Sequence, residues 1–164
     1  AAVAVHEAAH AAVLLLLGAE LCGIRLGFAQ LELRTGFLSW RTELWSAAAG
    51  PAVNLLCGTL FGRAAPEFAA VSLLLGTFNL LPVWPLDGGR VLRAALTAAF
   101  GLRGAHAAEL AGLACGILIC AAAVYAALWW QTGIWPVMAA AGLLLRLLWM
   151  RRTEKAVAFP RCRR

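Results

Sequence analysis

The sequence predicts an all-α polytopic membrane protein with about five transmembrane helices and a short membrane-associated β-hairpin. Hydrophobic residues make up 63% of the 164 residues, charged residues make up 13%, and the mean hydropathy is +0.81. A soluble core of this size could not bury so much apolar surface. The apolar residues also gather in runs close to the roughly 20 residues that a spanning helix needs. A lipid bilayer is therefore the expected surrounding.

The apolar runs predict the spanning helices directly. The candidates are residues 1–18, 45–62, 67–86, 107–130 and 133–150. Pro136 is expected to tilt the last of them or to break it near its start. Residues 88–104 predict a short amphipathic helix at the membrane interface, and His106 lies in a loop-like stretch where a solvated surface histidine is expected.

Residues 21–43 have a different pattern from the apolar runs. Apolar and polar residues alternate in Ile24-Arg25-Leu26 and in Leu31-Glu32-Leu33-Arg34, and glycines punctuate the segment. Alternation with a period of two is typical of strands with one face against an apolar surface. This segment therefore predicts the β-hairpin.

The basic residues predict the topology rather than a nucleic-acid partner. The net charge is +6, but the arginines are spread over short segments between apolar runs, with a cluster at the C-terminus. Because cytoplasmic loops are enriched in arginine and lysine, residues 88–104 and the C-terminus are expected on the cytoplasmic side of a multi-pass plasma-membrane protein. Arg90 and Arg93 are expected to anchor the membrane boundary.

The strongest chemical signal is the sequence His6-Glu7-Ala8-Ala9-His10 inside the first apolar run. Residues four apart on a helix lie on one face, so both imidazoles can reach one metal ion. A catalytic zinc site needs a third protein ligand and a water, and Asp87 is the one aspartate of the chain. Zinc lowers the pKa of its water to about 7, and Glu7 can accept the proton and pass it to a leaving amine. This combination predicts peptide hydrolysis.

Three alternatives to a protease stay open on the residues alone. The motif also occurs by chance in helices that bind nothing, but ionisable residues within a membrane cost roughly 2.5 to 3.5 kcal/mol each, which disfavours a structural role here. A catalytically silent zinc-binding membrane adaptor would not need Glu7. A zinc transporter would need further polar residues along a path, and residues 107–130 and 133–150 carry almost none.

Three motifs together resemble the site-2 protease family of intramembrane zinc metalloproteases, peptidase M50. They are His6–His10, the sequence Gly50-Pro51-Ala52-Val53-Asn54, and the stretch from Asn79 through Pro82, Pro85 and Asp87-Gly88-Gly89 to Arg90. The motifs occur in the order of the family and cover most of residues 1–100. They are most similar to the compact bacterial branch that includes the sporulation sigma-factor processing protease.

The resemblance implies one Zn²⁺ per chain and a role for each motif residue. The implied zinc ligands are His6, His10 and Asp87, with Glu7 as the general base. Asn79 would position the substrate. The implied packing and supporting residues are Gly50, Pro51 and Asn54. Two simpler interpretations remain for this last group: Gly50 and Pro51 could form a helix-packing kink, and Asn54 could make an interhelical hydrogen bond without a role at the site.

The predicted organisation is a single transmembrane metalloprotease domain, residues 1–150, followed by a basic cytoplasmic tail, residues 151–164. The resemblance implies a further spanning helix before residue 1. A helical substrate hides its peptide bonds, so the expected substrate is a membrane-tethered regulatory protein that is locally extended near its membrane segment, where the edge of the 21–43 hairpin could hold it. A homo-oligomer or a regulatory membrane partner is left open.

Overall fold

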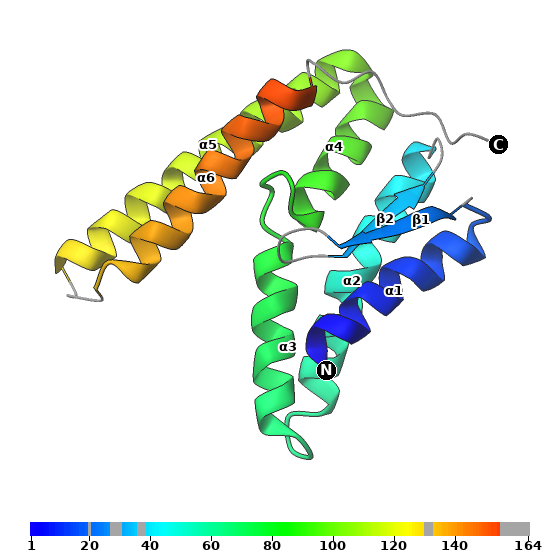
Figure 1. Cartoon of the computed structure of the whole chain (residues 1–164), viewed down its shortest axis with the longest axis horizontal. Coiled ribbons are helices and arrows are strands. Elements are labelled where there is room, and N and C mark those ends of the chain that lie inside the picture. Colours follow the sequence, from blue (N-terminus) through cyan, green and yellow to red (C-terminus); the bar gives the residue numbers. More distant parts are fainter. Residues whose placement is uncertain (20, 27–30, 36–38, 130–132, 155–164) are drawn as a thin grey trace.

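The computed structural model describes the backbone of residues 1–19, 21–26, 31–35, 39–129 and 133–154, and the side chains of residues 1–19, 39–129 and 133–145. Within these residues it contains helices and one hairpin (Figure 1). The elements are α1 (Ala2–Leu16), β1 (Leu21–Leu26), β2 (Leu31–Thr35), α2 (Trp40–Leu60), α3 (Pro66–Asn79), α4 (Asp87–Phe100), α5 (Leu102–Trp129) and α6 (Trp135–Glu154).

Helix α2 is the centre of the fold. It packs against α1, α3 and α4, while α4 packs on α5, and α5 packs on α6. Figure 1 shows the α5–α6 hairpin projecting away from the other helices. The largest fully buried side chains come from α2, α3 and the segment between α3 and α4; they are Val83, Asn54, Pro51, Ser46 and Ser72. The best-buried part of the molecule is thus small and rich in polar groups.

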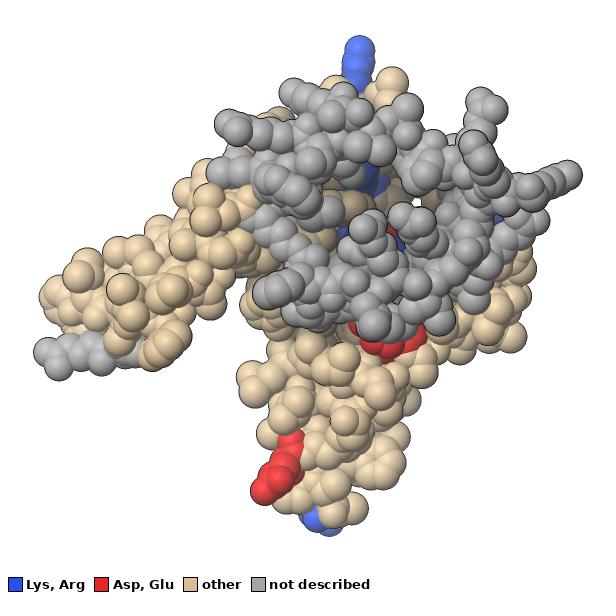
Figure 2. Space-filling model, viewed as in Figure 1, with Lys and Arg blue, Asp and Glu red and all other residues tan. Residues whose placement is uncertain are grey.

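Helices lie at all five predicted spans, but they differ in how well each could cross a bilayer. In the part of the chain that the structure describes, α5 alone combines the length and the apolar composition of a membrane span. Only 11% of its most apolar window is buried, so it is not the core helix of a soluble fold. In the view of Figure 2, the described surface of the projecting part of the hairpin shows residues other than Lys, Arg, Asp and Glu. The membrane prediction is supported here, while the number of crossings stays a prediction.

The prediction of one helix over residues 67–86 is wrong for residues 80–86. Helix α3 ends at Asn79, and residues 80–86 form a compact non-helical segment before α4 begins at Asp87. Pro82 and Pro85 lack the amide hydrogen that a continuing helix needs. The segment bonds its own backbone instead, with Val83 N donating to Leu81 O and Leu86 N donating to Val83 O. Asp87 therefore begins a helix, whereas the sequence had placed it at the end of one.

Two expectations for the C-terminal half are also corrected. Gly101 has a φ of 61°, a left-handed conformation that favours glycine, and α5 begins immediately after it at Leu102. His106 is exposed as expected, but it lies within α5 and not in a loop. Pro136 does not break the last helix; it lies in the first turn of α6, where a proline is tolerated.

The predicted hairpin is present but shorter than residues 21–43. Strands β1 and β2 pair antiparallel, with Ile24 opposite Leu33 and Arg25 opposite Glu32. Residues 40–43 belong instead to the first turn of α2, where the Ser39 side chain caps the helix by accepting a hydrogen bond from Thr42 N. Of the predicted basic tail, residues 151–154 complete the backbone of α6, and residues 155–164 lie outside the described residues.

Candidate metal centre

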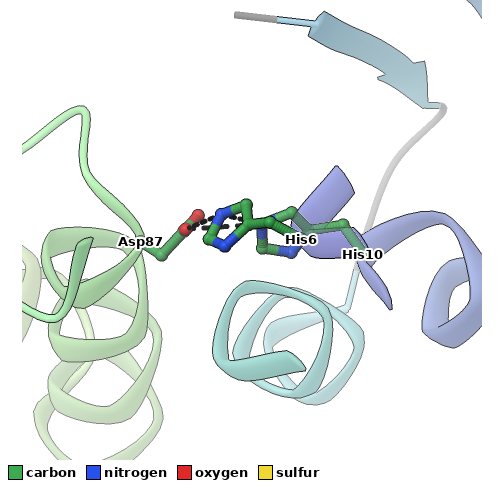
Figure 3. A group of neighbouring side chains, drawn as sticks. All are labelled: His6, His10 and Asp87. Atoms are coloured by element: carbon green, nitrogen blue, oxygen red, sulfur yellow. Dashed lines mark hydrogen bonds and ion pairs between the residues drawn. The ribbon is translucent and has the colours of Figure 1, made fainter. Parts of the chain in front are cut away.

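Three side chains that sequence analysis proposed as zinc ligands meet at one point. His6 and His10 project from α1, and Asp87 projects from the first turn of α4 to meet them (Figure 3). His6 Nε2 lies 3.0 Å from Asp87 Oδ2 and 3.1 Å from His10 Nε2, and His10 Nε2 lies 3.3 Å from Asp87 Oδ2. All three residues are buried. Their ligand atoms lie within 4.8 Å of one another, as a shared metal ion requires.

The donor set fits zinc in both chemistry and spacing. Zinc binds histidine nitrogen at about 2.0–2.1 Å, so the ligand atoms of a tetrahedral site stand about 3.3 Å apart. The three separations here, 3.0, 3.1 and 3.3 Å, are close to that value. Two histidines and one carboxylate also match the three-ligand sets of catalytic zinc sites, which keep a fourth position for water.

His10 is oriented by a backbone carbonyl of α2. Its Nδ1 lies 2.6 Å from Ser46 O, and because a carbonyl can only accept, Nδ1 carries the proton and donates it. In the neutral imidazole, Nε2 is then a lone pair that faces the Asp87 carboxylate and His6. Lone pairs of nitrogen and oxygen repel one another when they converge in a buried space. A metal ion or a proton between them removes this repulsion.

His6 is held from its other side by Asn54. The Asn54 side chain is fully buried, and its amide nitrogen lies 3.1 Å from His6 Nδ1, while Asn54 Oδ1 has no hydrogen-bond partner within the described residues. If Nε2 of His6 binds a metal, Nδ1 carries the proton and needs an acceptor. Turning the Asn54 amide by half a turn places Oδ1 there. Asn54 thus makes the predicted interhelical hydrogen bond, and its partner is a candidate metal ligand.

We expect Asn54→Leu to weaken zinc affinity about 10- to 100-fold, because it removes the hydrogen bond that orients His6 and keeps the volume nearly constant. The measurement is competition with a chromophoric chelator, using the protein in detergent. Asn79→Leu is the matched control. The Asn79 amide donates to Leu75 O of its own helix, 3.1 Å away, so its loss should leave zinc affinity unchanged. Equal affinities for wild type and Asn54→Leu would contradict this role.

Gly50 packs directly against both histidine rings. A Cβ atom at this position would lie 2.7 Å from His6 Cε1 and 2.6 Å from His10 Cε1, well inside van der Waals contact. Gly50 and Pro51 were predicted to be packing residues, and both are buried in α2. The structure adds that the surface on which Gly50 packs is the ligand pair itself.

The position of Asp87 depends on the two glycines that follow it. A Cβ at Gly88 would collide with the Leu80 carbonyl, and one at Gly89 would lie 2.6 Å from Trp84 N. Because both positions are glycine, residues 80–86 can fold closely over the start of α4. Asp87 lies in the first turn of that helix, where the helix dipole favours a negative charge.

Two other predicted site residues lie outside this cluster of contacts. Glu7 is half-buried on α1 between the two histidines, and within the described part of the chain no hydrogen bond or ion pair holds its carboxylate. Asn79 is half-buried at the end of α3 and bonds its own helix, so its predicted role in positioning substrate stays a prediction.

Comparisons with known proteins agree with this geometry. The sequence model of Peptidase family M50 matches residues 61–123, a stretch that contains Asp87 and begins after the histidines. The chain is 37% identical over 113 residues to Rip3 of Mycobacterium tuberculosis, covering 56% of this chain and 28% of Rip3. It is 35% identical over 72 residues to the zinc metalloprotease MJ0392 of Methanocaldococcus jannaschii, covering 36% of this chain and 21% of that protein. The chain thus spans about a quarter of the length of these relatives.

The fold is also known from a solved structure. The site-2 protease from Methanocaldococcus jannaschii superposes with a TM-score of 0.70 at 21% identity, over 97% of this chain and 76% of that one. This likeness shows that the chain has the fold of that site-2 protease. The family-model match over residues 61–123 and the likeness to these zinc metalloproteases thus cover parts of the chain, and the likeness in fold covers nearly all of it.

Proposed function

We propose that this chain is an intramembrane zinc metalloprotease that hydrolyses a peptide bond within or near the membrane segment of a membrane-tethered regulatory protein. The observation that carries the proposal is the buried meeting of His6, His10 and Asp87 beside Glu7. Residues 1–150 would form one metalloprotease domain that holds one Zn²⁺. We also propose that the chain belongs to the compact bacterial branch of the site-2 protease family.

The residues of the chain divide the chemistry between them. His6 and His10 would hold the metal through Nε2, and Asp87 would hold it through Oδ2. When bound, zinc supplies a Lewis acid that activates water and polarises the scissile carbonyl. The Glu7 carboxylate accepts a proton from the attacking water and returns it to the leaving amine. Asn79 would contact the substrate near the scissile peptide.

The substrate would have to be extended where it is cut. A helix buries its peptide groups in internal hydrogen bonds, which keeps them from the metal and the base. The hairpin of β1 and β2 supports this proposal, because a two-stranded sheet leaves main-chain groups on its outer edges for an added strand. Such pairing binds the substrate through its main chain and depends little on its sequence. Selectivity would therefore come from the position at which the substrate is tethered to the membrane.

The proposed location is the plasma membrane of a bacterium, with α4 and the C-terminus in the cytoplasm. The long apolar α5 supports the membrane, and the arginines of α4 and of the C-terminal residues support the orientation. Homo-oligomers and regulatory membrane partners are compatible with the exposed apolar faces and are not needed for the chemistry proposed here.

The test measures zinc content and cleavage of a membrane-tethered reporter on the same purified protein. We expect the wild type to bind one zinc, to lose cleavage on chelation, and to regain it when zinc is restored. His10→Ala should reduce both zinc content and cleavage to background, because two remaining ligands do not make a catalytic site. His106→Ala is the matched control, since it removes an exposed histidine on α5 and should change neither.

Each outcome has a distinct meaning. A wild type that binds no zinc would overturn the metalloprotease. Zinc binding that requires His10, without cleavage of any reporter with an extended membrane-proximal segment, would favour the silent adaptor. Cleavage that survives chelation would point to another chemistry altogether.

A further inference from the structure

Arg90 joins the candidate metal ligand Asp87 to a second carboxylate on another helix. Its Nε donates to Glu43 Oε1 at 2.8 Å, and its Nη1 donates to Asp87 Oδ1 at 3.5 Å. Arg90 follows Asp87 by three residues on α4, so the two side chains share a helix face. Glu43 lies in the first turn of α2, the helix that also carries Ser46, Gly50 and Asn54.

The two oxygens of Asp87 face different partners. Oδ2 faces the histidines, 3.0 Å from His6 Nε2 and 3.3 Å from His10 Nε2. Oδ1 faces the Arg90 guanidinium. A carboxylate that is free on both sides can bind a metal through both oxygens, whereas an oxygen that accepts from a guanidinium is held away from the metal.

The burial of these groups distinguishes them from a surface ion pair. The Asp87 side chain is 9% exposed, and those of Arg90 and Glu43 are 28% and 27% exposed. Charges with so little water around them interact more strongly than exposed pairs. The Arg90 guanidinium, which was expected at the membrane boundary, contacts the carboxylates of Glu43 and Asp87.

We propose that Arg90, held by Glu43, is a positioning residue that occupies Asp87 Oδ1, so that Asp87 presents only Oδ2 to the metal. One carboxylate oxygen and two histidine nitrogens would leave the fourth position of a tetrahedral zinc site open for water. Glu43 acts through Arg90, because its carboxylate contacts the guanidinium and not the metal ligands. This inference rests on the proposed function, since it assigns a role at the same metal centre.

The experiment measures zinc affinity by chelator competition and the visible absorption of the Co²⁺-substituted protein, both on the purified membrane protein. We expect Arg90→Gln to weaken zinc affinity about 10- to 100-fold. Its Co²⁺ absorption should also be weaker, because a second Asp87 oxygen that joins the metal raises the coordination number above four. Arg90→Lys should lie between wild type and Arg90→Gln, because lysine retains the charge without the fork that reaches both carboxylates.

Glu43→Gln tests the contact between Glu43 and Arg90. It should change affinity and spectrum in the same direction as Arg90→Gln, and the double variant should be no worse than Arg90→Gln alone, because Glu43 has no effect except through Arg90. Arg103→Gln is the matched control; it removes an exposed arginine at the start of α5 and should match wild type in both measurements.

Several results would overturn the inference. If Arg90→Gln and Arg90→Lys keep wild-type zinc affinity and Co²⁺ absorption while the protein melts at a lower temperature, Arg90 merely ties α2 to α4. Additive losses in the double variant would give Glu43 an effect of its own. If Arg90→Gln fails to fold, Arg90→Lys and Glu43→Gln decide between the same outcomes. A wild type without metal would remove the proposed function together with this inference, whereas a metal-binding wild type and unchanged variants would remove the inference alone.

Discussion

Gly50→Ala will abolish zinc binding although it adds a single methyl group. The added Cβ would lie 2.6 Å from His10 Cε1 and 2.7 Å from His6 Cε1, where carbon atoms normally stay about 3.5–4.0 Å apart. Both rings would have to move by about 1 Å, whereas metal–ligand distances tolerate only about 0.2 Å. The loss should therefore exceed the roughly 10- to 100-fold expected for a change in a supporting hydrogen bond.

The rings cannot easily move away from the new methyl group. His10 is held by the Ser46 carbonyl of the same helix α2, and His6 is held by Asn54 one turn after Gly50. Helix α2 therefore carries the new methyl group and also holds both histidine rings next to it. The site would respond by opening between α1 and α2, which separates the histidines from Asp87.

Gly142→Ala provides the control for Gly50→Ala. A Cβ at Gly142, within α6, would meet no atom within 4 Å. Alanine favours a helix over glycine by up to about 1 kcal/mol, so this variant should keep its zinc affinity and melt no earlier than wild type. Chelator competition measures the affinity, and thermal unfolding followed by circular dichroism measures stability. A Gly50→Ala protein that binds zinc like wild type would show that the packing of Gly50 on the ligands is not required.

The candidate ligands could be proposed from the sequence because they have signatures of their own. His6 and His10 have the spacing that puts two imidazoles on one helix face, and ionisable residues in an apolar run need a reason to be there. Asp87 was the sole aspartate available. That it meets His6 across 81 residues could not be derived from spacing, because it depends on how α1 and α4 pack on α2.

The groups that support the ligands could be predicted only in part. Asn54 was proposed from its motif, with its partner unknown. The contact of His10 with the Ser46 carbonyl was missed, since every residue has a carbonyl and the sequence does not indicate which one is used. The pairing of Arg90 with Glu43 was missed for a similar reason: a salt bridge between residues 47 apart is a property of helix packing.

The errors in the fold have identifiable causes. Hydropathy alone extended a helix through residues 80–86, although Pro82 and Pro85 already argued against it. The hairpin was drawn too long because Ser39 was not recognised as a helix cap, although a serine ahead of an acidic first turn is such a signal. The assignment of His106 to a loop was wrong because the connection between α4 and α5 is very short. One left-handed glycine, Gly101, joins the two helices.

Glu7→Gln will keep its zinc and lose its hydrolytic activity. Glutamine has nearly the same size and polarity as glutamate but cannot accept a proton, and proton transfer by a positioned side chain contributes about 10²- to 10⁴-fold to a rate. Glu7 lies between the two histidines in sequence and is half-buried, yet it is not one of the three groups whose ligand atoms converge. Its loss should therefore lower kcat for reporter cleavage by that factor and leave the chelator-competition affinity unchanged.

Glu109→Gln is a suitable comparison because it removes a carboxylate of α5 that is not part of the ligand cluster, and it should leave zinc affinity and kcat unchanged. The informative contrast is between variants of neighbouring residues: His6→Ala should lose both zinc and cleavage, while Glu7→Gln should lose cleavage alone. If Glu7→Gln cleaves at the wild-type rate, Glu7 is not the base. If it loses zinc as His6→Ala does, the carboxylate supports the metal, and the proton must be accepted by another group.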